Sequence, residues 1–175
     1  ESHPDQFRRA AKAADIVSAK NSDQVSGLIS IEGAEALGQA PGDASGPEAE
    51  AVIGNLHSFY ARGVRLITLT WSRPNPLGMG VSPSSQPQAP GGLTPLGRRV
   101  LHEMEKLGMV VDVSHLSDQG LSDVLQIAGR PIVASHSNSR ALCDCRRNLR
   151  DDQAEAIAKT GGLIGLTFCG SFIDP

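Results

Sequence analysis

The chain has 175 residues, a formal net charge of −3 and an aromatic content of 3%. This length suits one domain that buries a sizeable core. The weak net acidity and the few aromatic side chains argue against nucleic-acid binding, which needs a basic surface and rings on which bases stack. No window approaches the roughly 18 unbroken apolar residues that span a bilayer, so we predict no transmembrane segment.

The cysteines are Cys143, Cys145 and Cys169. An odd number does not form a disulfide framework, and Cys143 and Cys145 are too close in sequence for an easy disulfide. We therefore expect free thiols, which favours a cytoplasmic location. The chain starts without a signal peptide but also without Met, so a secreted or membrane-anchored protein with a missing signal stays an alternative.

Hydrophobic periodicity predicts that helices and short apolar strands alternate along the chain. The predicted helices cover residues 5–20, 47–62, 94–107, 117–129 and 151–160. The predicted strands cover residues 27–32, 65–70, 109–115, 131–136 and 163–168. Apolar strands between helices predict a parallel sheet covered on both faces. Either a doubly wound sheet or a (β/α)₈ barrel satisfies this pattern, and the pattern alone does not separate them.

Local signals support some of these assignments. The helix over 5–20 rests on apolar residues that share one helical face, namely Phe7, Ala10, Ala14 and Val17. Thr94 is expected to cap the helix over 94–107, which Gly108 ends. The stretch 72–92 is rich in Pro, Gly and Ser and is expected to be a long loop.

Glu32, His115 and His136 are each the last residue of a predicted strand. Parallel α/β folds gather their ligands at the C-terminal ends of strands, so these side chains should converge. The two histidines are 136 − 115 = 21 residues apart, which leaves room for one helix between neighbouring strands. A carboxylate and two imidazoles suit zinc or a similar divalent ion.

Period-two alternation adds an expectation about packing. With His115 pointing inward, Val111 and Val113 share its face, and Asp112 and Ser114 take the other. The imidazole is then expected at the rim of an apolar barrel interior.

Four long stretches follow one another along the chain: GLISIEG (27–33), GVRLITLTWSRPNPLG (63–78), GLTPLGRRVLHEMEKLGMVVDVSHLSD (92–118) and PIVASHSNSRALCDCRRNLRDDQ (131–153). Together they resemble the renal (membrane) dipeptidase family, from about residue 5 onward. The resemblance implies a (β/α)₈ barrel with two zinc ions. It also implies hydrolysis of dipeptides, including those with a C-terminal D-residue, by a metal-activated hydroxide.

The resemblance also implies roles for single residues. Glu32 matches the glutamate that bridges the two zinc ions, and His115 and His136 match the histidines that complete the second zinc site. These three are therefore the expected catalytic and metal-binding residues. Arg147 matches the arginine that binds the substrate carboxylate, a role that suits its planar guanidinium. Asn148 follows it in the motif and is also expected at the substrate.

Trp71 stands where many relatives carry a substrate-contacting histidine, and we include it among the expected substrate-binding residues. The family's first zinc is also held by a His-X-Asp pair at the end of an upstream strand. His3-Pro4-Asp5 has this spacing but precedes a predicted helix, so we interpret it as a chance match.

A (β/α)₈ barrel needs about 250 residues, and this chain offers about five of the eight β/α units. We therefore expect residues 1–175 to be a single partial barrel domain, an internal fragment with one complete three-ligand zinc site. A dipeptide is the expected ligand, and a homodimer is allowed.

The sequence leaves other interpretations of the function open. The chain could be a truncated, non-catalytic relative, or another metal-dependent amidohydrolase that acts on cyclic amides or lactones. A nucleotide-binding domain is disfavoured because no predicted strand is followed by a Gly-rich phosphate loop.

Overall fold

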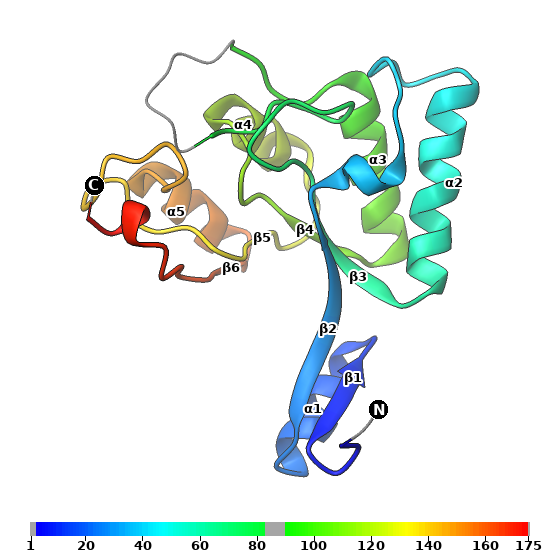
Figure 1. The fold of residues 1–175 in the computed structure, drawn as a ribbon, viewed down its shortest axis with the longest axis vertical. Helices are drawn as coiled ribbons and strands as arrows, with labels where there is room; N and C mark the ends of the chain where they lie inside the picture. The colour runs from blue at the N-terminus through cyan, green and yellow to red at the C-terminus, as the bar shows by residue number, and fades with distance from the viewer. Residues whose placement is uncertain (1–2, 83–89, 175) are drawn as a thin grey trace.

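The computed structural model describes residues 3–82 and 90–174, and its strands form one parallel sheet in the order β1-β2-β3-β4-β5-β6 (Figure 1). The strands are β1 Phe7–Ala10, β2 Val25–Glu32, β3 Val64–Thr68, β4 Val110–Asp112, β5 Val133–Ala134 and β6 Leu163–Ile164. The helices are α1 Ala13–Asn21, α2 Pro47–Ala61, α3 Pro95–Leu107, α4 Asp118–Ile127 and α5 Asp151–Lys159. Two short 3₁₀ helices, η1 Ala34–Leu37 and η2 Gly170–Phe172, complete the elements.

The strand order decides between the two architectures that the sequence allowed. Each strand pairs in parallel with the next one along the chain, and a helix follows each of β1 to β5. A doubly wound sheet reverses its strand order at a switch point, whereas a (β/α)₈ barrel runs in sequence. The described residues therefore form part of a (β/α)₈ barrel, with five β/α units and a sixth strand.

The predicted helix over 5–20 is wrong in its first half. Residues Phe7–Ala10 form β1, which pairs with the first half of β2, and the helix begins only at Ala13. The carboxylate of Asp15 accepts hydrogen bonds from the backbone N–H groups of Ala11 and Lys12, at 2.9 and 3.0 Å, and so fixes the helix start. The apolar residues of the predicted helix do not form one buried face. Phe7 is 51% and Val17 59% exposed, whereas Ala10 is buried.

The hydrophobic core lies between the sheet and the helices α2, α3 and α4. Its largest fully buried side chains include Leu56, Ile67, Leu101, Met104 and Ile132. As predicted, the Thr94 side chain caps α3 by accepting from the Gly97 N–H at 3.0 Å, and Gly108 ends it in the left-handed conformation.

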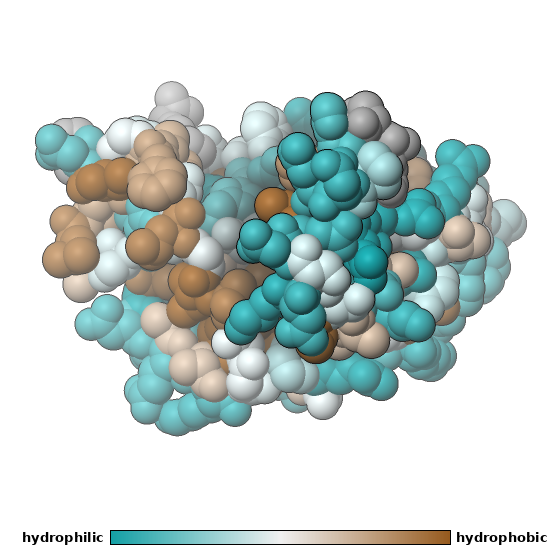
Figure 2. Space-filling model, turned by 90° about the horizontal axis from the view of Figure 1, so that it is seen from below, coloured by the Kyte–Doolittle hydropathy of each residue, from teal (hydrophilic) through white to brown (hydrophobic). Residues whose placement is uncertain are grey.

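The two edge strands present apolar surface to solvent. Leu163 of β6 is 64% exposed and Phe7 of β1 is 51% exposed. Figure 2 shows apolar patches on the face seen from below. The three cysteines are free thiols, as expected. None of the helices in the described part of the chain is both long enough and apolar enough to cross a membrane. The predicted loop over 72–92 lies partly outside the described residues.

Candidate metal centre

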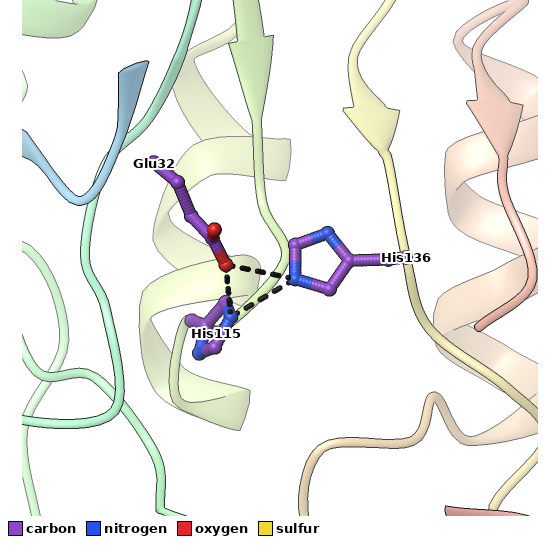
Figure 3. Close-up of side chains that lie close together, drawn as sticks. All are labelled: Glu32, His115 and His136. Atoms are coloured by element: carbon purple, nitrogen blue, oxygen red, sulfur yellow. Dashed lines mark hydrogen bonds and ion pairs between the residues drawn. The ribbon is translucent and has the colours of Figure 1, made fainter. Parts of the chain in front are cut away.

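Three side chains meet at the C-terminal edge of the sheet (Figure 3). The Oε1 atom of Glu32 lies 3.0 Å from Nε2 of His115 and 3.3 Å from Nε2 of His136. The two Nε2 atoms lie 2.9 Å apart. The fold thus brings together the three residues that the strand-end pattern indicated, with one ligand atom from each.

Each of these side chains comes from a different strand. Glu32 is the last residue of β2 and pairs in register with Thr68 of β3. His136 follows two residues after the end of β5 at Ala134. His115 follows three residues after the end of β4 and has a φ of 69°, which is uncommon for a residue other than glycine. The two predicted strands that end on histidines were therefore too long, but they are neighbours, as their spacing indicated.

The strand predicted over residues 109–115 ends at Asp112, and His115 lies in a turn beyond it. Val111 and Val113 are buried in the hydrophobic core. The Oδ1 atom of Asp112 accepts from the Ser114 N–H at 3.0 Å, a local turn that ends the strand before His115 is reached.

A serine hydroxyl holds the Nδ1 atom of each imidazole. The Ser72 Oγ lies 3.1 Å from Nδ1 of His115, and the Ser135 Oγ lies 2.7 Å from Nδ1 of His136. When the serine oxygen accepts from Nδ1–H, the imidazole presents the lone pair of Nε2 to a metal. Both imidazoles direct Nε2 into the cluster.

The donor set and its spacing fit a zinc ion. Tetrahedral zinc with ligands at about 2.0–2.1 Å separates those ligand atoms by about 3.3 Å. The three separations here are 2.9, 3.0 and 3.3 Å. Two nitrogen lone pairs and a carboxylate oxygen this close repel one another, and a cation between them turns the repulsion into attraction.

The protonation state of His115 suits metal binding. Burial lowers its pKa to about 3, and the positive charges of Arg147 and His136 act in the same direction, partly opposed by Asp112. The imidazole is therefore neutral at neutral pH, which is the form that coordinates a metal.

Arg147 is buried close to this cluster, in the loop between β5 and α5. Its side chain is 3% exposed, and its guanidinium carbon lies 5.5 Å from the ring centre of Phe172. Burial lowers its pKa to about 10, against the opposing charges of groups that include Asp112 and Glu32. It therefore stays charged at neutral pH. Its Nε and Nη2 atoms have no hydrogen-bond partner among the described residues.

The other two residues expected to bind substrate, Trp71 and Asn148, have different surroundings. Trp71 is 44% exposed and its ring lies 6.1 Å from that of His115, centre to centre, so it borders the cluster. The Asn148 amide is engaged by the loop itself: its Nδ2 donates to the carbonyls of Cys143 and Phe172, at 3.0 and 2.9 Å. Asn148 thus stabilises the loop that carries Arg147.

Comparison with known proteins identifies the family. Residues 1–175 match the membrane dipeptidase family, peptidase family M19, over the whole chain. The chain belongs to the membrane dipeptidase family. It is 32% identical to dipeptidase 3 of Mus musculus over 149 residues, which cover 84% of this chain and 28% of that protein. It is 35% identical to an uncharacterised protein of Acinetobacter calcoaceticus over 161 residues, 91% of this chain and 47% of that protein.

Solved structures agree with this assignment. The fold matches a metallopeptidase of Rhodobacter sphaeroides, solved with a phosphinate mimic of the dipeptide L-Ala-D-Ala, with a TM-score of 0.83 and 36% identity. The match covers 98% of this chain and 46% of that one. The chain thus spans about half the length of the Rhodobacter metallopeptidase and of the Acinetobacter protein, at 46% and 47%.

Asp112 and Ser135 border this candidate metal centre and were not identified from the sequence as site residues. Asp112 is fully buried and its carboxylate contacts the Ser135 hydroxyl, which in turn contacts His136. The available signal was a carboxylate within the apolar run MVVDVSH, because a charged group is buried in a strand only with partners.

Proposed function

We propose that the protein containing this chain is a zinc-dependent dipeptidase, and that its substrates include dipeptides with a C-terminal D-residue. The observation that carries the proposal is the triangle of Glu32, His115 and His136 close to the buried guanidinium of Arg147. The relative solved with an L-Ala-D-Ala mimic supports the choice of substrate.

The triangle would hold one metal ion through Glu32 Oε1 and the two Nε2 atoms. When bound, zinc supplies a water of lowered pKa and polarises the scissile carbonyl. The neutral state of His115 keeps its lone pair available for this ion. The Glu32 carboxylate would offer its second oxygen to a further cation, as expected of a glutamate that bridges two metals.

Arg147 would select substrates with a free carboxylate. Its Nε and Nη2 atoms form one edge of the planar guanidinium, and this edge matches the two oxygens of a carboxylate. A carboxylate bound there satisfies two donors that otherwise stay buried without partners, which favours its binding. A fixed carboxylate close to the metal centre limits the length of the substrate. Lactones and cyclic amides without a carboxylate gain nothing from this contact.

The test is hydrolysis by the protein that contains this chain, after metal removal and after zinc is added back. We expect zinc to restore cleavage of L-Ala-L-Ala and L-Ala-D-Ala, with little cleavage of tripeptides or lactones. Glu32→Gln should lose zinc affinity and activity together. Glu35→Gln is the matched control, because Glu35 lies three residues away and faces Arg73, at 3.5 Å. Activity that survives complete metal removal would contradict the proposal.

A further inference from the structure

A buried carboxylate lies behind the candidate metal centre and is not one of its ligands. Asp112 is fully buried, and each of its oxygens accepts two hydrogen bonds. Oδ1 accepts from the backbone N–H groups of Ser114 and Ser135, both at 3.0 Å. Oδ2 accepts from the hydroxyls of Thr68, at 2.7 Å, and Ser135, at 2.5 Å. This carboxylate links the ends of β3, β4 and β5.

The direction of the Ser135 hydroxyl fixes the proton on His136. A serine has a single hydroxyl hydrogen, and that of Ser135 points to Asp112, because a carboxylate can only accept. The contact of 2.7 Å between Ser135 Oγ and His136 Nδ1 must then be donated by the imidazole. Nδ1 of His136 therefore carries the hydrogen, and the lone pair of Nε2 faces Glu32 and His115.

The backbone of His136 is held by the neighbouring strand end. The His136 N–H donates to the Ser114 Oγ at 3.1 Å, and Ser114 lies two residues from Asp112. Both the ring and the main chain of His136 are thus tied to the same turn after β4. The hydroxyl bridge fixes the rotation of the imidazole ring. The backbone contact fixes the position of the main chain from which the ring extends.

We propose that Asp112 and Ser135 are positioning residues, which hold His136 through the hydroxyl bridge in the tautomer and orientation that bind the metal. The inference rests on the proposed function, because it takes the Glu32, His115 and His136 cluster as a metal site. Partners of this kind orient a ligand and increase its basicity, and their loss typically costs about 10–100-fold in metal affinity.

The test is the zinc affinity of Ser135 variants in the full chain, measured by competition with a chromophoric chelator. Ser135→Ala removes the bridge and should lower the affinity by about 10–100-fold. The visible spectrum of the cobalt-substituted protein should change with it, because that spectrum reports ligand geometry. Ser135→Thr keeps the hydroxyl and should restore both readouts.

The matched control is Thr70→Val. Thr70 is fully buried just beyond the end of β3, and its hydroxyl has no hydrogen-bond partner among the described residues. Its loss should leave zinc affinity and the cobalt spectrum unchanged. If Ser135→Ala does not fold, Ser135→Cys replaces it, because a thiol keeps the side-chain size but bonds weakly to hydrogen-bond partners.

The possible outcomes separate this inference from the proposed function. If the unmodified chain binds zinc and the Ser135→Ala or Ser135→Cys chain binds it equally well with the same cobalt spectrum, the positioning role is excluded and the metal site stands. A Ser135→Thr chain that folds but binds as weakly as Ser135→Ala also excludes it. If the unmodified chain binds no zinc, the proposed function fails, and the positioning role fails with it.

Discussion

The two parts of the candidate site are held in different ways. Glu32 and the two histidines lie at or within three residues of strand ends, so the hydrogen-bonded sheet fixes their positions. Arg147 is a buried residue of the loop over 137–150, which contains no helix or strand. Side chains hold that loop: Asn148 donates to two carbonyls, and Arg140 Nε donates to the Asn148 carbonyl at 2.9 Å. The positions of the proposed metal ligands thus depend on the sheet, whereas the position of the proposed carboxylate-binding arginine depends on a network of side chains.

The two parts also differ in charge. The imidazole of His115 is neutral because burial lowers its pKa to about 3, whereas Arg147 keeps its charge with a pKa of about 10. A cation bound beside His115 would interact favourably with the lone pair of the imidazole. An anion bound beside Arg147 would interact favourably with the charge of the guanidinium. Substitutions should therefore separate metal binding from substrate binding, and the following predictions test that separation.

The largest effect is expected from His115→Asn. Asparagine tolerates the left-handed backbone that His115 adopts, so the substitution removes a metal ligand with little backbone strain. Zinc affinity should fall by more than about 100-fold, beyond the loss expected for a residue that only orients a ligand. Zinc titration of the purified chain measures it. His57→Asn is the control, because His57 pairs with Glu103 at 2.9 Å on the surface. Unchanged zinc affinity in His115→Asn would contradict the assignment.

Effects of intermediate size are expected from Arg147→Met: activity should fall, whereas stability should rise. Loss of the charged contact to a substrate carboxylate should lower kcat/KM by about 10–100-fold, because hydrogen bonds to charged groups contribute about 1.5–3 kcal/mol. Zinc affinity should not change. The free energy of unfolding without substrate should rise by about 1–3 kcal/mol, because a buried charge with two unpaired donors is replaced by an apolar chain.

Steady-state kinetics and urea unfolding measure the two effects of Arg147→Met. The control is Arg62→Met at an exposed position, where the unfolding free energy should change by no more than about 0.5 kcal/mol. A substitution at Arg147 that destabilises the protein and leaves kcat/KM intact would assign this residue to the structure of the loop instead of the substrate.

The same contrast explains what the sequence could predict. The ends of apolar runs are visible in one dimension, and a parallel fold brings such ends to one edge, so Glu32, His115 and His136 could be found together. The loop has no periodic pattern. Arg147 was found only through its resemblance to a family motif, and the structural task of Asn148 depends on the carbonyl of Phe172, 24 residues away.

The errors have physical causes as well. Apolar residues spaced three or four apart in 5–20 fit a helix, but Phe7–Ala10 pairs with β2, and tertiary pairing outweighs a local pattern. The role of Asp112 was hidden because its partner Ser135 lies 23 residues away on the neighbouring strand. The strand predicted over residues 109–115 ends at Asp112, because the turn begins before the apolar run ends.

The smallest effect is expected from Asp118→Asn. Asp118 lies at the start of α4, and its carboxylate connects the loop over 137–150 to the barrel. The carboxylate accepts from Arg140 at 2.9 Å through both oxygens and from Gln153 at 2.9 Å, and it also pairs with Arg150 at 2.6 Å. Burial acts to raise its pKa, but the hydrogen bonds from Arg140 and Gln153 and the charges of Arg140 and Arg150 bring the pKa below its ordinary value of 3.8.

The sign of the pH dependence follows from that lowered pKa. The contribution of Asp118 to stability is complete above pH 3.8 and is lost as the pH falls through the lower value of the folded state. Because the side chain is 46% exposed, solvent screening limits the contribution to about 0.5–1 kcal/mol. Urea unfolding of Asp118→Asn should show this deficit at neutral pH and a shrinking one in acid, with KM raised a little and zinc affinity intact. Asp144→Asn, an exposed carboxylate on the same loop, should show no such trend. A deficit that stays constant as the pH falls would mean that the shape of the side chain, and not its charge, holds the loop.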